Sequence, residues 1–387
     1  MFKAATVRSN EVFSRHLGHQ LGQALEKELG QTPKACWFFA APSSGISELF
    51  KGIGESLGSH NLVGCTSDGE ISGDGLSTNS VVLGGIVTDQ IDFEIATAQG
   101  LSQDSEGAGR RLAGAFSKTP RYIQIFSDGL TGNGCAILKG LTSVLGGHIP
   151  IAGGTAGDNG KFLKTLQFAG DQVYTDTLCG IAFYGDFHLG TGVHSGWSPI
   201  GLAKRVTRSK GNVLYELNGE PALNVYERFL GRHAEKLPVI GVEYPLGLLE
   251  PCGEAGQEDY HLIRATMAVN REERSITFAG EITEGALVHL TCGDVSSILD
   301  AADKATGLAK SALSGHSPSM AFCYSCMARK IVLGRRTEEE IQRVRAEIGL
   351  SVPIIGFYTY GEYCRVSAGG PNYFHNETIT LSLLGMG

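Results

Sequence analysis

Three glycine-rich turns carry side chains that could contact a ligand. They cover residues 153–159 (GGTAGDN), 193–201 (VHSGWSPIG) and 356–362 (GFYTYGE). Glycine lets the backbone adopt a positive φ or approach a ligand closely, so clustered glycines beside Asp, His, Trp and Tyr indicate a shaped pocket. None of the three turns matches a known catalytic signature. The turns therefore predict a pocket but no particular reaction.

Two of the 11 histidines stand in surroundings that suit a flat cofactor. His194 leaves a predicted apolar strand directly before Ser-Gly-Trp, so its imidazole would lie beside the ring of Trp197 and a backbone without a side chain. His375 lies in the run Tyr-Phe-His-Asn before the last predicted strand. Either ring could ligate a metal. The alternative for each is a core histidine that hydrogen-bonds the backbone.

One pair among the nine cysteines has a spacing that suits chemistry. Cys323 and Cys326 form a C-x-x-C pair, which could supply two zinc ligands or a redox pair. Zinc would need two more thiolates or imidazoles, and Cys364 and His375 are candidates if the fold brings them close. The alternative is that both cysteines are small buried side chains.

The common enzyme templates are absent from the sequence. It has no G-x-x-x-x-G-K-[ST], no G-x-G-x-x-G after a strand and no H-E-x-x-H. Glu362, Cys326 and His375 could form a nucleophile and base set only if the fold makes them converge. We therefore expect a protein that is not an enzyme.

Composition points to an ordinary globular chain without nucleic-acid or membrane partners. The 387 residues are 42% hydrophobic and 19% charged, enough for two or three cores. Lys and Arg number 32 against 40 Asp and Glu, so the net charge is −8, and the basic residues form no long run. No stretch of about 20 apolar residues and no signal-peptide pattern is visible. We expect a cytoplasmic protein that is not anchored.

The hydrophobic periodicity predicts an α+β protein. Four-residue spacing of leucines predicts a helix over 11–29, and further helices are expected at 46–57, 104–116, 135–145, 295–314 and 337–348. Short strands joined by glycine turns from residue 165 to 216 predict an antiparallel meander. Strands outnumber helices, so we expect two domains of mixed, largely antiparallel sheets covered by helices, divided into residues 1–220 and 221–387.

Several of these segments together carry a family resemblance. In this order along the chain, they resemble the FIST sensory domain family, as a FIST N part followed by a FIST C part over nearly the whole sequence. The family implies small-ligand sensing that is passed to a signalling partner. The segments are residues 153–162, 192–201, 212–223, 325–329, 356–362 and 374–378.

A chain of this size and order of parts is similar to the nitric-oxide-sensing FIST hemoproteins called NosP. That resemblance implies heme b, with nitric oxide or heme controlling a partner sensor histidine kinase in two-component signalling, and through it cyclic-di-GMP and biofilm behaviour. His194 would ligate the iron, with His375 as the alternative. Trp197 would line the heme site, and Arg205 or Arg208 would meet the propionates. Whether the chain forms a homodimer stays open.

The competing hypothesis is a sensor of an amino acid or a similar metabolite, without heme. Asp158, Tyr360 and Glu362 would face an ammonium or hydroxyl group, and Arg329 would face a carboxylate. Cys326 and Asn376 complete the predicted ligand pocket. Colour separates the two hypotheses, because a heme protein is red and an amino-acid sensor is colourless.

Overall fold

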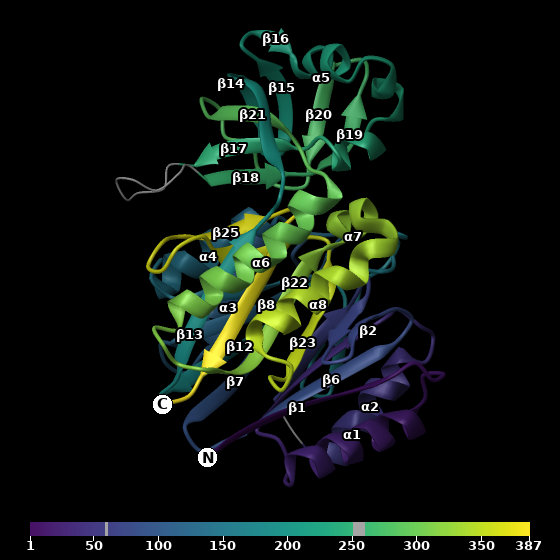
Figure 1. Cartoon of the computed structure of the whole chain (residues 1–387), viewed down its shortest axis with the longest axis vertical. Coiled ribbons are helices and arrows are strands. Elements are labelled where there is room, and N and C mark those ends of the chain that lie inside the picture. Colours follow the sequence, from purple (N-terminus) through teal and green to yellow (C-terminus); the bar gives the residue numbers. More distant parts are fainter. Residues whose placement is uncertain (59–60, 251–259) are drawn as a thin grey trace.

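Three helix-covered sheets and a fourth, separate sheet make up the structure, a computed structural model that describes residues 1–58, 61–250 and 260–387. We call the described part of residues 198–292 the cap, and residues 1–197 and 293–387 the body. The cap stands on one end of the body, and the chain crosses between them on two segments (Figure 1).

The body consists of three repeats, each built as strand, helix, strand, helix, strand, hairpin and closing strand. In the first repeat, Ser14 caps α1 by accepting a hydrogen bond from Leu17 N at 3.2 Å, and Gly30 ends it in the left-handed conformation. Its elements are β1 (Phe2–Ser9), α1 (Arg15–Leu29), β2 (Ala35–Ala40), α2 (Ile46–Leu57), β3 (Leu62–Thr66), β4 (Glu70–Ser72), β5 (Gly75–Ser77) and β6 (Val81–Thr88).

The second repeat follows the same order. Asp104 and Asn133 cap its two helices, accepting from Gly107 N at 2.7 Å and Ala136 N at 3.0 Å. Its elements are β7 (Ile91–Gln99), α3 (Ser105–Ala115), β8 (Tyr122–Ser127), α4 (Gly134–Leu145), β9 (Ile151–Thr155), β10 (Gln167–Ala169), β11 (Gln172–Tyr174) and β12 (Thr177–Gly185).

The third repeat contains the cap as an insertion after its first strand. Asp294 caps the returning helix by accepting from Ser297 N at 2.9 Å. The elements of this repeat are β13 (His188–His194), α6 (Val295–Ala312), β22 (Pro318–Cys326), α7 (Met327–Leu333), η3 (Gly334–Arg336), α8 (Thr337–Ile348), β23 (Ile354–Thr359), β24 (Glu362–Arg365), β25 (Asn372–His375) and β26 (Ile379–Gly385).

Each repeat gives its hairpin to the sheet of another repeat. The hairpin β4–β5 pairs with β23, β10–β11 pairs with β3, and β24–β25 pairs with β9. Each of the three sheets of the body has one parallel pair, namely β2–β3, β8–β9 and β22–β23, and its remaining pairs are antiparallel. The exchange ties the beginning and the end of the chain into one body.

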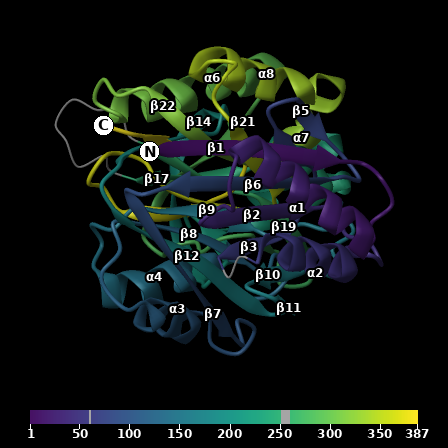
Figure 2. The same cartoon turned by 90° about the horizontal axis from the view of Figure 1, so that it is seen from below.

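Aromatic side chains fill the space where the three sheets meet. Figure 2 shows the strands of the body on the inside and its helices on the outside. The ring of Phe39 stacks on that of Phe357, with centroids 4.5 Å apart, and Trp37 donates to Gln124 Oε1 at 2.6 Å. The helices cover the outer faces, where glycines let α1 approach α2 and α3 approach α4. All three repeats therefore share one central core.

The cap has a core of its own around Tyr226, Leu262 and Phe278. Its strands form the fourth sheet in the order β18-β17-β21-β14-β15-β20-β19, with β16 beside β15. Its elements are β14 (Ser198–Lys210), β15 (Val213–Leu217), β16 (Glu220–Pro221), α5 (Ala222–Leu230), η1 (Gly231–Lys236), η2 (Val239–Val242), β17 (Leu246–Glu250), β18 (Tyr260–Arg264), β19 (Thr266–Asn270), β20 (Ser275–Phe278) and β21 (Leu287–Cys292).

The predicted fold class is confirmed: the structure is α+β, with mixed, largely antiparallel sheets. The predicted meander over 165–216 differs from the structure, because its strands join four different sheets. The division at residue 220 stays a prediction about domains. Among the described residues, none of the helices combines the length and apolar character that a membrane crossing requires.

Candidate functional site

A cavity of about 640 Å³ lies between the cap and the carboxyl ends of β8, β9, β22 and β23. Ligands of α/β proteins commonly bind at the carboxyl ends of parallel strands. The body side of the wall includes Ser127, Asp128, Gly129, Leu130, Thr131, Gly132, Gly134, Ile137, Thr155, Phe162, Cys326, Met327, Ala328, Ile331, Tyr360, Tyr363 and Phe374. The cap contributes Asn212, Pro238, Val239, Val242, Ala265, Thr266, Met267, Phe278 and Ala279.

The loop after β8 forms one side of the cavity and is held by its own side chains. Asp128 Oδ1 accepts from the N–H groups of Leu130 and Thr131 at 2.9 and 3.1 Å, and its Oδ2 accepts from Asp176 N at 3.0 Å. Asn133 caps the helix that follows. These bonds fix a rigid rim rather than leaving the loop free to fold over a ligand.

Two of the predicted glycine-rich turns meet at the cavity. The hydroxyl of Tyr360 donates to Asp158 Oδ1, and the two carboxylate oxygens of Asp158 also accept from the N–H groups of Phe162, Leu163 and Lys164 at 2.7–2.9 Å. Burial opposes the charge, but these bonds outweigh it and lower the pKa of Asp158. Asp158 therefore holds the loop in place and has little capacity left for a ligand.

Phe162 forms an aromatic platform at the mouth of the cavity. Its ring stacks on Tyr360 with centroids 4.6 Å apart and an interplanar angle of 20°, and it is 45% exposed. Its φ is 54°, which is uncommon for a bulky residue and is sustained here by the Asp158 hydrogen bond.

The other predicted pocket residues divide into wall and interior. Cys326 and Tyr360 line the cavity, whereas Glu362 and Asn376 are completely buried. Glu362 accepts from the hydroxyls of Thr359 and Thr378, and burial raises its pKa to about 7. Neither the Oδ1 nor the Nδ2 atom of Asn376 has a hydrogen-bond partner among the residues that the structure describes.

The C-x-x-C pair is buried. Burial raises the pKa of both the Cys323 and the Cys326 thiol, so neither is an activated nucleophile. Within residues 1–58, 61–250 and 260–387, no cluster of three His, Cys, Asp or Glu side chains is placed to hold a metal ion.

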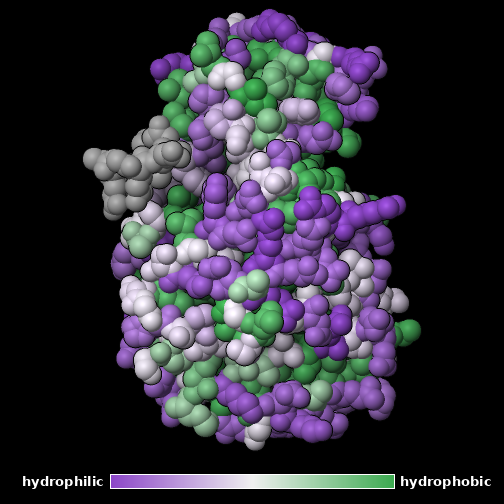
Figure 3. Space-filling model, viewed as in Figure 1, coloured by the Kyte–Doolittle hydropathy of each residue, from purple (hydrophilic) through white to green (hydrophobic). Residues whose placement is uncertain are grey.

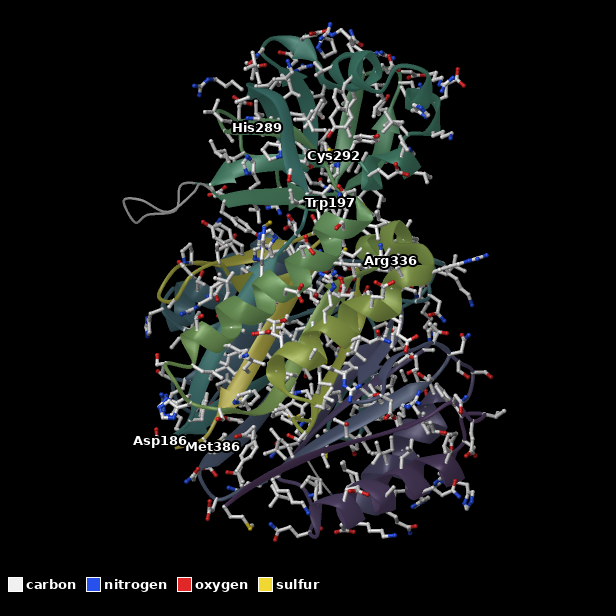
Figure 4. All side chains as sticks on the ribbon, in the orientation of Figure 1. Asp186, Trp197, His289, Cys292, Arg336 and Met386 are labelled. Carbon is white, nitrogen blue, oxygen red and sulfur yellow. The ribbon has the colours of Figure 1, made fainter. Side chains whose placement is uncertain are left out.

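The residues predicted to hold heme do not come together. His194 lies at the end of β13, in the body, while Arg205 lies in the cap sheet and donates to Gly285 O at 2.9 Å. Trp197 is buried against Ile298 and Leu333 beside the crossing segments, where Figure 4 labels it. Proximity along the sequence misled this prediction, because β14 belongs to another sheet than β13.

The two candidate iron ligands differ in their surroundings. His194 Nδ1 is buried without a hydrogen-bond partner among the described residues, and burial followed by the charges of Lys304 and Arg329 lowers its pKa to about 4. His375 is completely buried, with Nε2 2.9 Å from Cys364 O and Nδ1 3.2 Å from the hydroxyl of Tyr260. Burial lowers the pKa of His375 to about 3. Both rings are neutral at pH 7.

Arg329, expected to face a ligand carboxylate, is instead completely buried. Its guanidinium contacts Glu340 and donates to the carbonyls of Ser195 and Ile298. The sequence analysis also missed Glu377, a completely buried carboxylate next to Asn376. A signal was present: residues 79–80, 176–177 and 377–378 each read Asn, Asp or Glu followed by Ser or Thr, at the start of the closing strand of a repeat.

Comparison with known proteins places this architecture. Residues 4–220 match the FIST N domain and residues 222–365 match the FIST C domain. The uncharacterized protein MJ1623 of Methanocaldococcus jannaschii is 24% identical over 84% of this chain and 66% of its own length, so the chain spans about two thirds of that relative. Among solved structures, the cyanuric acid hydrolase from A. caulinodans aligns over 100% of both chains with a TM-score of 0.37 and 8% identity. The chain belongs to the FIST family, whose domains are generally small-ligand sensors in signalling.

Proposed function

We propose that this protein senses a small metabolite with an apolar body, such as an amino acid or a related amine, in the cavity between body and cap. The observation that carries the proposal is the cavity itself: its volume lies within the range of about 300–1,000 Å³ typical of small-molecule sites. Most of its walls are apolar, with a few polar groups among them, including Thr266, Cys326 and Tyr360.

Exposed hydrophobic side chains at the cavity support a ligand with an apolar part. Val239 and Met267 of the cap and Ile331 of α7 are 77%, 46% and 55% exposed, and all three line the cavity. Figure 3 shows hydrophobic side chains beside α7, where the cap meets the body. An apolar ligand would cover part of this surface, which stabilises the complex by about 25 cal/mol for each Å² removed from water.

Sensing requires that the ligand favour one arrangement of the protein over another. Both walls contribute to the cavity, and the cap is joined to the body through the two crossing segments at residues 194–198 and 292–295. A ligand that contacts both walls would therefore shift the position of the cap. In this proposal the protein acts as a sensor and not as an enzyme, and a partner such as a sensor histidine kinase reads the shifted surface.

Filling the cavity tests the proposal. Ala265 lines the cavity and is half-buried, whereas Ala268, on the neighbouring strand β19, is exposed and is not part of the wall. A thermal-shift screen of amino acids and amines should find a compound that raises the Tm of the wild type. Ala265→Phe should abolish that rise and Ala268→Phe should preserve it. A hit that binds both variants equally would show that the ligand site lies elsewhere.

Heme b with nitric oxide, as in the NosP-type proteins, is a second candidate function. One observation favours it, the unpartnered Nδ1 of His194 in the described structure. Against it, the described cavity wall contains no histidine, and both ring nitrogens of His375 are engaged. These observations favour the metabolite over heme. A heme, if bound, would supply a gas-binding iron, and a cyclic-di-GMP and biofilm output belongs to this candidate.

A spectrum decides between the two candidates. Protein expressed with ample heme should be colourless if the cavity binds a metabolite. A stoichiometric Soret band that shifts with nitric oxide, and that disappears in His194→Ala while the fold persists, would establish the heme sensor instead.

A further inference from the structure

Glu377 occupies a position that the three repeats share. Each repeat has a residue with positive φ one or two positions before its closing strand: Asn79 at 53°, Asp176 at 50° and Glu377 at 58°. Asn and Asp tolerate the left-handed region through their short polar side chains, whereas Glu does not share this advantage. Strained residues cluster at functional sites, so the exception in the third repeat is a candidate for one.

The environment of Glu377 also differs from that of its counterparts. Asn79 is exposed, and the carboxylate of Asp176 accepts hydrogen bonds from Ser102 and Thr131. Glu377 is completely buried, and neither of its carboxylate oxygens has a hydrogen-bond partner among the residues described. An unpaired buried carboxyl group is rare without a function. Burial, followed by the charge of Glu362, raises the pKa of Glu377 well above its usual value, so its charged form needs a cation beside it.

Glu377 lies directly behind the cavity wall. Cys326, which lines the cavity, donates its backbone N–H to Thr378 O at 2.9 Å, next to Glu377. On the cap side, burial and then the charge of Glu377 raise the pKa of Tyr226. The amide of Asn376 is likewise without partners within the described residues. In the cap, the hydroxyls of Tyr226 and Thr266 lie near each other without forming a hydrogen bond of good geometry. Hydrogen-bonding groups from body and cap therefore converge here unused.

The basic side chain near Glu377 is not available to pair with its carboxylate. Arg329 is the basic residue whose charge acts on Glu377, but its guanidinium already contacts Glu340 and two backbone carbonyls. The neighbouring carboxylate, Glu362, repels rather than compensates. A ligand that brings its own positive charge would satisfy the site.

We propose that Glu377 and Asn376 bind the protonated nitrogen of a ligand whose apolar body occupies the cavity. The assignment rests on the proposed function and narrows it to ligands with a primary ammonium group. The carboxylate oxygens of Glu377 and the amide oxygen of Asn376 accept from the ammonium N–H groups, and the hydroxyl of Thr266 adds an acceptor from the cap. A neutral ligand of equal shape leaves these acceptors unpaired, and this is the basis of selectivity.

Two probes of equal shape test the proposal in the wild-type protein. Isopentylammonium and 3-methylbutan-1-ol carry the same apolar body and differ in the charged group. Calorimetric titration should show the ammonium binding about 10- to 100-fold more tightly than the alcohol, as expected for hydrogen bonds to a charged group. Equal binding of the two, or binding of neither, would overturn the assignment.

A variant of Glu377 gives an independent readout. Glu377→Asn introduces the residue of the first repeat, so the unliganded protein should have a higher Tm while its preference for the ammonium disappears. The matched control is Glu70→Gln, because the buried carboxylate of Glu70 already accepts from Ser67 and Ser80. The control should retain the preference. A lower Tm with unchanged ammonium binding in Glu377→Asn would show a purely structural role.

The cavity variant separates this proposal from the broader one. If Ala265→Phe blocks binding of a screened compound but the wild type does not distinguish ammonium from alcohol, the cavity is a ligand site and the role of Glu377 is wrong. If Ala265→Phe affects the binding of no compound, the cavity itself is not the site.

Discussion

Arg329 fastens the first crossing segment and the start of α6 to the rest of the body, and replacing it with methionine tests that role. Nε donates to Glu340 Oε1 at 2.8 Å, Nη2 donates to Ile298 O at 2.8 Å, and Nη1 donates to Ser195 O. Ser195 leads into the cap and Ile298 lies in the first turns of α6, which returns from it. Both members of the ion pair are completely buried.

The expected loss of stability follows from these contacts. Removing one partner of a buried ion pair costs about 3–5 kcal/mol, and each of the two carbonyls left without this donor costs about 1–3 kcal/mol. Glu340 keeps hydrogen bonds from Ser325 and Tyr358, both at 2.7 Å, so the lower ends apply. Arg329→Met should therefore lower the free energy of unfolding by about 5 kcal/mol.

The second substitution distinguishes charge from packing. In Arg329→Met combined with Glu340→Gln no uncompensated charge remains, while the glutamine can still bond Ser325 and Tyr358. The double variant should recover at least about 1 kcal/mol relative to Arg329→Met alone.

The two tryptophans of the sequence allow the loss to be located. Trp197 lies beside the crossing segments and Trp37 lies in the central core of the body. Urea unfolding is followed by fluorescence in a Trp37→Phe background, which reports the junction, and in a Trp197→Phe background, which reports the body. The Trp197 transition should shift to lower urea more than the Trp37 transition. A loss below about 1 kcal/mol, or a double variant less stable than the single one, would refute the reasoning.

Two further predictions concern packing and pH. In α2, Gly52→Ala should lower the free energy of unfolding by about 1–3 kcal/mol, because the new Cβ would lie 2.1 Å from Arg15 O. Gly54→Ala, whose new Cβ would have nothing within 4 Å, should raise it by about 0.5–1 kcal/mol. Urea unfolding of both variants measures these differences. The pKa of His375 is about 3 in the folded protein and near 6.5 in the unfolded chain, so the unfolded chain takes up the proton first as the pH falls. The free energy of unfolding should therefore decrease by about 1.4 kcal/mol per pH unit below pH 6.5. His375→Gln should remove that part of the slope between pH 6 and pH 4, and His16→Gln, at an exposed position, should leave it unchanged.

Most helices and strands could be predicted because their signals are local. The spacing of Leu17, Leu21, Leu25 and Leu29 predicts α1, and all four side chains are buried in the structure. Sheet membership depends instead on contacts between distant residues. The pairing of β10 with β3 joins residues about 100 positions apart and leaves no periodic trace in either strand.

The site was predictable to a similar extent. The turns at 153–159 and 356–362 do meet, through Asp158 and Tyr360. The reason is that β9 and β23, which belong to parallel pairs in two different sheets, both end at the cavity. The turn at 193–201 belongs to a different place, since it is where the chain leaves the body for the cap. Sequence proximity cannot reveal such a departure, and the cavity itself exists only once the cap covers the strand ends.

The position of the cap explains why the cavity forms over the strand ends of the second and third repeats. Residues 10–14 and 100–104 connect the first strand to the first helix in repeats one and two, whereas residues 195–294 fill the same connection in repeat three. An insertion into a surface connection leaves the host repeat intact and starts and ends at neighbouring points. The cap is thus attached by two adjacent segments. Arg329 bonds the first of them at Ser195 and the helix that follows the second at Ile298. The described wall beneath the cap includes strand ends of the second and third repeats and none of the first. A ligand between cap and body can shift the equilibrium between two arrangements of the cap by no more than the difference between its binding free energies for those arrangements.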